Sequence, residues 1–411
     1  MEIMSPAGNF ETLAAAVNAG AGSVYFGLGK LNMRAKSTVN FSEDDLPEIV
    51  NYCSQNNVNS YLAVNTVMFD DDLDEMRRII DLAKVSGVTA IIASDTAVLN
   101  YARSQGVEIH ASTQLNISNI EAVKFFAAYC DVMVLARELS LDKIKYISSQ
   151  IREQNIRGPK GELVKIEIFV HGALCMATSG KCYLSLHEMN FSANRGQCLQ
   201  ICRRGYTVTD IETGRQLNIE NEYIMSPKDL CTVGFIDKII DAGVSVMKIE
   251  GRARPPEYVT TVTKVYRQAV DAVENNTFNA DLAESLTLKL RDVFNRDFWD
   301  GYYLGARLGQ WNDAYGNKAK YHKEFIGVIT NYFSRLQVGE MFVNSSQGLS
   351  VGDKVLIIGP TTGCLELEIT QLRNNDGVVE NALKGDTVSF PVEQKIRRAD
   401  KLYKLVENNF Y

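Results

Sequence analysis

The sequence predicts an α/β fold in which eight parallel strands and their helices close into a (β/α)8 TIM-like barrel, followed by a small antiparallel β-barrel domain. Three observations predict it. Short apolar, often β-branched runs alternate with helical segments up to about residue 250. Eight such runs match the strand number of a closed barrel. No G-x-G-x-x-G motif follows the first run, which disfavours an open dinucleotide-binding sheet.

The predicted strands follow one another in a regular order. They cover residues 2–5, 23–27, 61–65, 90–94, 108–112, 131–136, 166–171 and 246–250. After the second strand we expect a helix with Ser42 as its N-cap and acidic residues in its first turn. Residues 223–227 are a ninth candidate, one more than the barrel needs. They repeat the Ile-Met-Ser-Pro of the first strand, which indicates a weak internal repeat.

The chain is expected to divide into three parts. Residues 1–255 form the barrel, and residues 172–222 within it form a Cys-rich insertion, because they are too many and too polar for a simple βα loop. A hairpin is predicted inside the insertion at 206–219. Residues 256–322 read as a helical connection. Residues 323–411 contain short alternating strands separated by turn signals, which predicts the small β-barrel.

Composition and charge exclude some classes of protein. Hydrophobic residues make up 45% and charged residues 23%, the ordinary globular range. A net charge of -7 provides no global positive field for nucleic acid, so an RNA site would be a local patch. The opening residues show neither a basic nor an apolar signal region, and no apolar run reaches the roughly 20 residues of a membrane span. We therefore expect a cytoplasmic protein without membrane contact.

Five of the eight cysteines gather in one region of the chain. They are Cys175, Cys182, Cys198, Cys202 and Cys231. In a reducing compartment, clustered cysteines are more often metal ligands or catalytic groups than disulfides. Their spacing is less regular than the two close pairs of a structural zinc site, and it leaves an iron–sulfur cluster, zinc and unliganded thiols open. The scattered Cys53, Cys130 and Cys364 are predicted to be small buried hydrophobes.

Polar side chains follow the predicted strands at their carboxyl ends, where (β/α)8 barrels form their active sites. The candidate acid–base and anion-binding residues are His110, Arg137, Glu138, His171, Lys248, Glu250 and Arg252. The three cations would suit a dicarboxylate or a phosphate. Two of the chain's four histidines at such ends favour a functional role. Ser112 lies near His110, but without G-x-S-x-G or H-E-x-x-H a protease triad lacks support.

Residues 167–185, with the EIFVHGALC segment and Cys182, resemble the signature of the peptidase U32 family. Five further segments are similar to that family: SPAGNFETLAAAVNAGAGSVYFG at the start, NMRA, HASTQLN, KIEGRAR and NRDFWDGYYLG. The resemblance spans the whole chain. It implies an O2-independent hydroxylation protein with a 4Fe–4S cluster, acting on a ubiquinone precursor, ribosomal RNA or tRNA. The most similar branch makes 5-hydroxyuridine at the tRNA wobble position and depends on prephenate.

Carried over by motif, the resemblance implies a ligand set for that cluster. The implied ligands are Cys175, Cys182, Cys198 and Cys231, with Cys202 as the alternative fourth ligand. It also implies tRNA as a partner, prephenate as a dicarboxylate co-substrate, RNA contact by the C-terminal domain and a paralogous U32 subunit as a further candidate partner. Two other functions stay open: a U32-type peptidase or collagenase, and a non-catalytic RNA-binding cluster protein.

Overall fold

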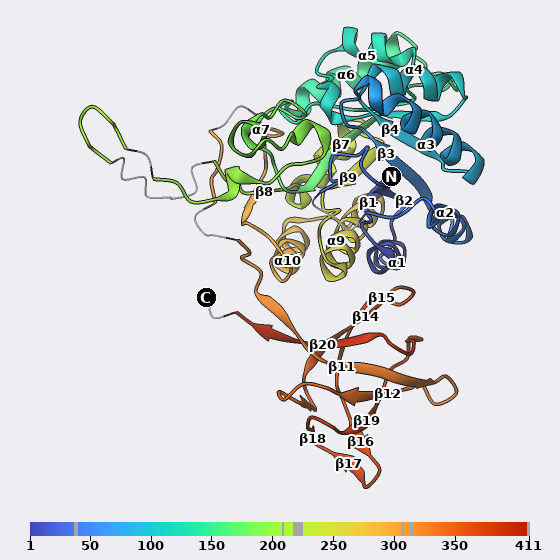
Figure 1. The fold of residues 1–411 in the computed structure, drawn as a ribbon, viewed down its shortest axis with the longest axis vertical. Coiled ribbons are helices and arrows are strands. Elements are labelled where there is room, and N and C mark those ends of the chain that lie inside the picture. The colour runs from blue at the N-terminus through green and yellow to red at the C-terminus, as the bar shows by residue number, and fades with distance from the viewer. Residues whose placement is uncertain (37–39, 208, 217–224, 306–307, 313–315, 409–411) are drawn as a thin grey trace.

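The computed structural model describes residues 1–36, 40–207, 209–216, 225–305, 308–312 and 316–408. Figure 1 shows a barrel surrounded by helices and, joined to it by the segment after the last helix, a separate sheet domain that ends near the C-terminus.

Eight parallel strands form a closed barrel. They are β1 (Glu2–Pro6), β2 (Ser23–Gly27), β3 (Asn59–Val64), β4 (Ala90–Ala93), β5 (Glu108–Ala111), β6 (Val132–Val134), β7 (Lys165–Gly172) and β9 (Val246–Ile249). The strands from β1 to β7 pair in chain order, and β9 closes the ring by pairing with both β7 and β1. Each overlaps a predicted run, so the predicted (β/α)8 barrel is confirmed.

Helices cover the outside of this barrel (Figure 1). They are α1 (Phe10–Asn18), α2 (Leu46–Gln55), α3 (Leu73–Ser86), α4 (Thr96–Ser104), α5 (Ile120–Ala127), α6 (Leu141–Glu153), α8 (Ile236–Asp241) and α9 (Pro256–Glu274). The predicted start of α2 is wrong. The helix begins at Leu46 with Asp45 as N-cap, because Pro47 fits the first turn. Ser42 instead donates its hydroxyl to the Asp45 carboxylate at 2.7 Å.

Two short strands extend the sheet beyond the barrel. β8 (Asp229–Cys231) pairs antiparallel with the end of β7, and β10 (Phe298–Trp299) pairs with β8. The ninth candidate strand at 223–227 lies partly outside the described residues, and its described end, Pro227, makes only an isolated bridge to Trp311. The predicted hairpin is described only in part, where Thr209 bridges Gln216 in antiparallel fashion.

Residues on the barrel strands alternate between two environments. The outward residues, such as Ile3, Phe26 and Ile91, belong to a large core packed under the helices. The inward apolar residues form a small cluster of Met4, Tyr25, Tyr61, Ala90, Ile92, Val132 and Val246. This alternation is the period-two pattern of a barrel strand. Because β5, β7 and β9 also carry polar side chains, the barrel interior is only partly apolar.

The remaining elements lie outside the barrel. They are α7 (Leu184–Met189) in the Cys-rich insertion, α10 (Ala280–Arg291), and the strands β11 (Tyr321–Phe333), β12 (Val338–Val343), β13 (Leu349–Ser350), β14 (Lys354–Gly359), β15 (Gly363–Glu368), β16 (Leu372–Asn374), β17 (Gly377–Val379), β18 (Asn381–Ala382), β19 (Thr387–Pro391) and β20 (Lys401–Glu407).

The C-terminal sheet is antiparallel, as predicted, and has its own apolar core. Its order is β15-β14-β20-β11-β12-β19-β16-β17, and β15 and β17 do not pair with each other in the part of the chain that the structure describes. A closed barrel is therefore not shown. The expected domain boundaries at residues 255 and 322 stay predictions.

The sheet domain rests on the barrel through β15, which packs against α1. The Asn18 amide donates to the Thr362 carbonyl at 3.2 Å, and the Lys323 ammonium pairs with Glu257 of α9 at 2.8 Å. Within the described residues, no helix combines the length and the apolar character needed to cross a bilayer.

Candidate active site and thiol group

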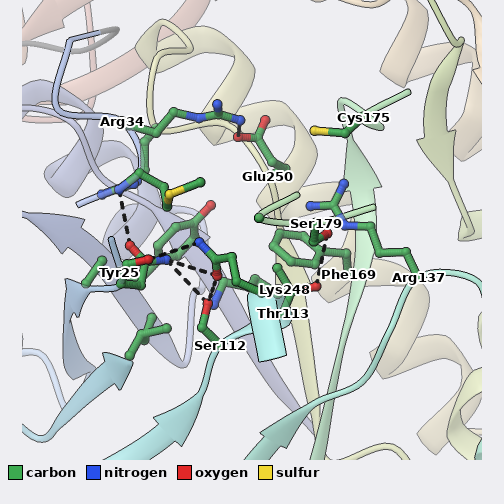
Figure 2. A pocket seen from close by; sticks show the side chains of 17 residues that line it. Tyr25, Arg34, Ser112, Thr113, Arg137, Phe169, Cys175, Ser179, Lys248 and Glu250 are labelled. Atoms are coloured by element: carbon green, nitrogen blue, oxygen red, sulfur yellow. Dashed lines mark hydrogen bonds and ion pairs between the residues drawn. The ribbon is translucent and has the colours of Figure 1, made fainter. Parts of the chain in front are cut away.

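A cavity of about 110 Å³ opens at the carboxyl ends of the barrel strands and is called the mouth cavity here. Its lining holds four cations, Arg34, Arg137, Lys248 and Arg252, and one carboxylate, Glu250. Figure 2 shows the aromatic rings of Tyr25 and Phe169 among them. Four of the predicted site residues therefore meet here: Arg137, Lys248, Glu250 and Arg252.

One ion pair neutralises part of this charge. The Arg34 guanidinium donates to Glu250 Oε1 at 2.7 Å (Figure 2). Burial alone would raise the pKa of Glu250, but the charge and hydrogen bond of Arg34 outweigh it and lower that pKa to about 2. Glu250 is thus held ionised at neutral pH.

Two other cations have no carboxylate partner among the residues described. Arg137 donates to the Ala173 carbonyl at 3.0 Å and stacks over the Phe169 ring at 4.0 Å, while its Nε is buried without a partner. Arg252 donates to Asn32 Oδ1 at 3.0 Å, and burial lowers its pKa to about 10. Arg252 is buried and Arg137 is partly buried, and neither directly contacts a carboxylate of the described residues, so an anion is the ligand that the mouth cavity suits best.

The predicted placement of His110 at the mouth is wrong. Its side chain points into the barrel interior, where Nδ1 bonds Glu167 Oε2 at 2.9 Å. It lines a second cavity, of about 270 Å³, which is formed by residues such as Glu108 and Asp131 at the amino ends of the strands and is called the base cavity here. His110 lies before the end of β5, so the residues that reach the mouth from β5 are Ser112, Thr113 and Gln114.

His171 and Glu138 also lie outside the mouth cavity. The register between β7 and β9 shifts between Phe169 and His171, which turns His171 away from the lining. It packs among the rings of Tyr258, Tyr266 and Phe298, and burial lowers its pKa to about 3, so it is neutral. Glu138 follows β6 in a turn and is exposed.

Arg34 was missed as a site residue. It lies in the long connection between β2 and α2, far from any strand end, so barrel topology does not single it out. The signal that could have found it is the NMRA stretch, which carried part of the family resemblance but had no role assigned to it.

The Cys-rich insertion closes over one side of the mouth. Cys175 and Gly180 line the mouth cavity directly, and the exposed Cys175 lies near Arg137 in its wall (Figure 2). The insertion is attached to the barrel, because Arg195 pairs with Asp72 at 2.7 Å and Lys36 donates its amide to the Gly196 carbonyl at 3.1 Å.

Three of the five clustered cysteines lie close enough to a fourth, Cys202, to act on its charge. Burial raises the pKa of Cys202, and the neighbouring Cys175, Cys198 and Cys182 raise it further. Cys175 and Cys198 also act on Arg34, whose pKa is raised mainly by Glu250. All eight cysteines are free of disulfides. These four residues are called the thiol group below.

Cys231 lies on a strand, outside the Cys-rich insertion that carries the thiol group. It ends β8 opposite His171 and faces the Tyr266 hydroxyl, and burial raises its pKa to about 11. Soft sulfur donors fit an iron–sulfur or zinc centre. Across the described residues, however, no three His, Cys, Asp or Glu side chains converge in a metal-binding arrangement. The donor chemistry therefore fits, while the implied ligand set with Cys231 stays a prediction.

The described residues hold no assembled protease site. None of their serine, threonine or cysteine side chains is hydrogen-bonded to a histidine. Ser112, the serine nearest to His110 in sequence, bonds Gln114 and Asn65 instead. A nucleophile activated by a neighbouring imidazole is thus not formed there.

Known proteins match this chain along its whole length. The model of a family described as peptidase family U32 matches residues 8–313. A protein of Porphyromonas gingivalis named collagenase is 54% identical over 98% of this chain and 97% of its own length. A tRNA hydroxylation protein of Bacillus subtilis is 29% identical over 98% of this chain and 94% of its own. A 23S rRNA 5-hydroxycytidine synthase of Escherichia coli is 31% identical over 100% of this chain and 56% of its own.

Proposed function

Because the chain belongs to peptidase family U32, we propose that it is an iron–sulfur enzyme that hydroxylates a wobble uridine of tRNA, with prephenate as co-substrate. The observation that carries the proposal is that the thiol group adjoins the mouth cavity. Cys175 lines the same cavity as Arg137 and Arg252. A thiolate-held centre would therefore lie beside a bound anion.

The mouth cavity supports a dicarboxylate as the small ligand. Arg137 and Arg252 each offer guanidinium donors without a carboxylate partner in the described chain. A guanidinium binds a carboxylate through paired charge-assisted hydrogen bonds. Prephenate has two carboxylates, one for each arginine, and the Phe169 and Tyr25 rings supply flat apolar walls for its ring.

Three ligands are common to both versions of the cluster site: Cys175, Cys182 and Cys198. The fourth is Cys231 in the version that the family resemblance implies. The electrostatics of the site support Cys202 instead, since Cys175, Cys198 and Cys182 each raise the pKa of Cys202. When bound, such a cluster supplies one-electron chemistry, while the chain's own residues hold the anion and orient it.

An RNA substrate is supported by the relatives. Proteins named for tRNA and rRNA hydroxylation align with nearly the whole chain. The net charge of -7 means that RNA would be bound by local cations rather than by a global field. The cationic mouth is one such local site.

The test is the modification itself. A host strain lacking this gene is complemented with the wild-type chain, Cys175→Ala, Arg137→Met or Cys364→Ala, and 5-hydroxyuridine is measured in digested tRNA by mass spectrometry. The wild type and Cys364→Ala, a cysteine at the domain contact that serves as matched control, restore the modification. Cys175→Ala and Arg137→Met do not. Restoration by Cys175→Ala equal to that of the wild type would contradict the proposal.

A peptidase is the second candidate, because the relative at 54% identity is named collagenase. It requires a nucleophile that the described residues do not assemble. Anaerobically purified protein is incubated with gelatin, as wild type and as Cys175→Ala. Cleavage by both proteins at the same rate would favour the peptidase over the iron–sulfur hydroxylase.

A further inference from the structure

Three buried polar side chains form a continuous line through the barrel interior. His110 Nδ1 bonds Glu167 Oε2 at 2.9 Å, and Glu167 Oε1 accepts from Lys248 Nζ at 2.7 Å. Their relative exposures are 1%, 0% and 4%. They come from β5, β7 and β9, three strands that lie far apart in the sequence. We call them the interior triad.

The interior triad joins the two ends of the barrel. Lys248 lines the mouth cavity, and His110 lines the base cavity. The free ring nitrogen of His110, Nε2, is buried without a hydrogen-bond partner, and Glu108 Oε1 lies 3.9 Å from it. The base cavity is polar and large enough for water, which would complete the bonding of Nε2.

Packing does not require these charges. An apolar side chain at each position would fill the interior without the cost of desolvating ions, and the neighbouring inward residues are mostly apolar. Burial lowers the pKa of Lys248, while Glu167 opposes this effect. Burial alone would raise the pKa of Glu167, but Lys248 and His110 outweigh it and lower it to about 2. The Lys248 ammonium thus depends on Glu167.

We infer that Glu167 and His110 are positioning residues that hold the Lys248 ammonium at the floor of the mouth cavity, where it faces the anionic co-substrate. The inference rests on the proposed function for the identity of that anion. His110 fixes one carboxylate oxygen of Glu167, so the other oxygen is directed at Lys248. His110 therefore acts on the mouth cavity indirectly, from the barrel interior, through Glu167 and Lys248.

Other charged groups face the interior triad and share in its pH dependence. Arg252 and Arg137 act on Lys248 from the mouth side, and the Tyr25 ring lies 4.6 Å from its ammonium. Glu108 and Asp131 face His110 from the base side, where the Tyr61 ring also packs against the imidazole.

The first experiment measures prephenate binding by calorimetry from pH 6 to pH 9, on full-length protein purified anaerobically. The variants are Glu167→Gln, His110→Ala and His110→Gln. Without the Glu167 charge, Lys248 loses its proton at lower pH. Glu167→Gln is therefore expected to bind at least tenfold more weakly at pH 8 and nearly normally at pH 6. His110→Ala weakens binding, and His110→Gln restores it, because the glutamine amide still donates to Glu167.

The second experiment needs no ligand. Acetic anhydride acylates only neutral amines, so the acetylation rate of Lys248 at pH 8, read by peptide mass spectrometry against the exposed Lys384, reports the charge on Lys248. Glu167→Gln is expected to raise this rate at least fivefold. Equal rates in folded Glu167→Gln and wild type would overturn the inference. Failure of the wild type to bind prephenate at any pH would instead overturn the proposed co-substrate, while the labelling still tests the interior triad.

Discussion

At the scale of single residues, the mouth cavity is defined by positive charge that the protein leaves unbalanced. Arg34 has Glu250 and Lys248 has Glu167, but Arg137 and Arg252 bond only neutral oxygens in the described structure. An arrangement of this kind is costly unless a ligand completes it.

Removing either unbalanced arginine is expected to weaken prephenate binding. Arg137→Met or Arg252→Met removes one charge-assisted contact, which is worth about 1.5–3 kcal/mol, or roughly 10- to 150-fold in Kd. Isothermal calorimetry measures the change. The exposed Arg77 on α3, which pairs with Asp74, is the matched control, and Arg77→Met should leave Kd unchanged. Equal Kd values in all three variants would remove the mouth cavity as the anion site.

Strand ends predicted some of the mouth residues correctly and others not. Arg137 and Arg252 were found because they follow apolar runs, and Lys248 because it lies near the end of the last such run. The histidines were misplaced for two physical reasons. His110 precedes the end of its strand and points inward by alternation, and the register shift in β7 turns His171 aside. Neither the last paired residue of a strand nor a β-bulge can be predicted from the pattern of apolar residues alone.

At the scale of elements, the Cys-rich insertion and the connection that carries Arg34 are held together by a close backbone approach. A Cβ atom placed on Gly196 would collide with the Asn32 carbonyl and would lie 2.9 Å from the Ala35 side chain. The φ of Gly196 is 79°, in the left-handed region. Only glycine fits both the space and the backbone conformation there.

Gly196→Ala is expected to separate these two elements. The new methyl group would collide with the backbone around Asn32, so the variant should lose thermal stability and bind less iron during anaerobic reconstitution. Gly214→Ala is the matched control, because Gly214 also has a positive φ, 68°, but nothing lies within 4 Å of its Cβ position. The two variants should share the cost of backbone strain, about 1 kcal/mol. Equal iron content in both would show that the contact is not needed.

The extra strand β8 shows why element boundaries escape a sequence pattern. The ninth candidate at 223–227, which resembles β1, lies partly outside the described residues, and the strand that follows it, Asp229–Cys231, is only three residues long. Its pairing with the end of β7 is a tertiary contact, and a run of three residues carries no periodicity. The same pairing sets Cys231 opposite His171, which spacing alone could not indicate.

At the scale of the whole molecule, carboxylates with lowered pKa values make the stability of the fold depend on pH. Lys248 and His110 lower the pKa of Glu167 to about 2 and Arg34 does so for Glu250, each against the opposing effect of burial. Lys228 likewise lowers the pKa of the partly buried Asp297 to about 2, against the opposing effect of burial. A carboxylate whose pKa is lower in the folded state stabilises the fold above its unfolded pKa and loses that contribution as the pH falls.

The melting temperature is therefore expected to fall most steeply between about pH 4.5 and pH 2. Differential scanning calorimetry of the wild type and Glu250→Gln measures this. The variant should be less stable at pH 7, because Arg34 loses its partner, and should show a shallower decline in the acidic window. Glu284→Gln, an exposed position on α10, should match the wild type. A decline as steep in Glu250→Gln as in the wild type would contradict the account.

The global architecture was largely predictable, because the alternation of strands and helices and the change to short strands after residue 323 are strong periodic signals. Closure of the C-terminal sheet was not, since it depends on whether β15 meets β17, a contact between strands without any local signature. The interior triad was equally hidden, because His110 and Glu167 are 57 residues apart in the sequence and Glu167 and Lys248 are 81 residues apart.

The central claim is that Cys175, Cys182 and Cys198, with either Cys202 or Cys231 as the fourth ligand, hold an iron–sulfur cluster beside the cationic mouth. The most direct test measures iron and acid-labile sulfide per chain after anaerobic purification. The account predicts about four of each in the wild type, a loss of most of both in Cys175→Ala, Cys182→Ala and Cys198→Ala, and a loss in one of Cys202→Ala and Cys231→Ala, which identifies the fourth ligand. Wild-type protein that contains neither iron nor sulfide after anaerobic reconstitution would contradict it.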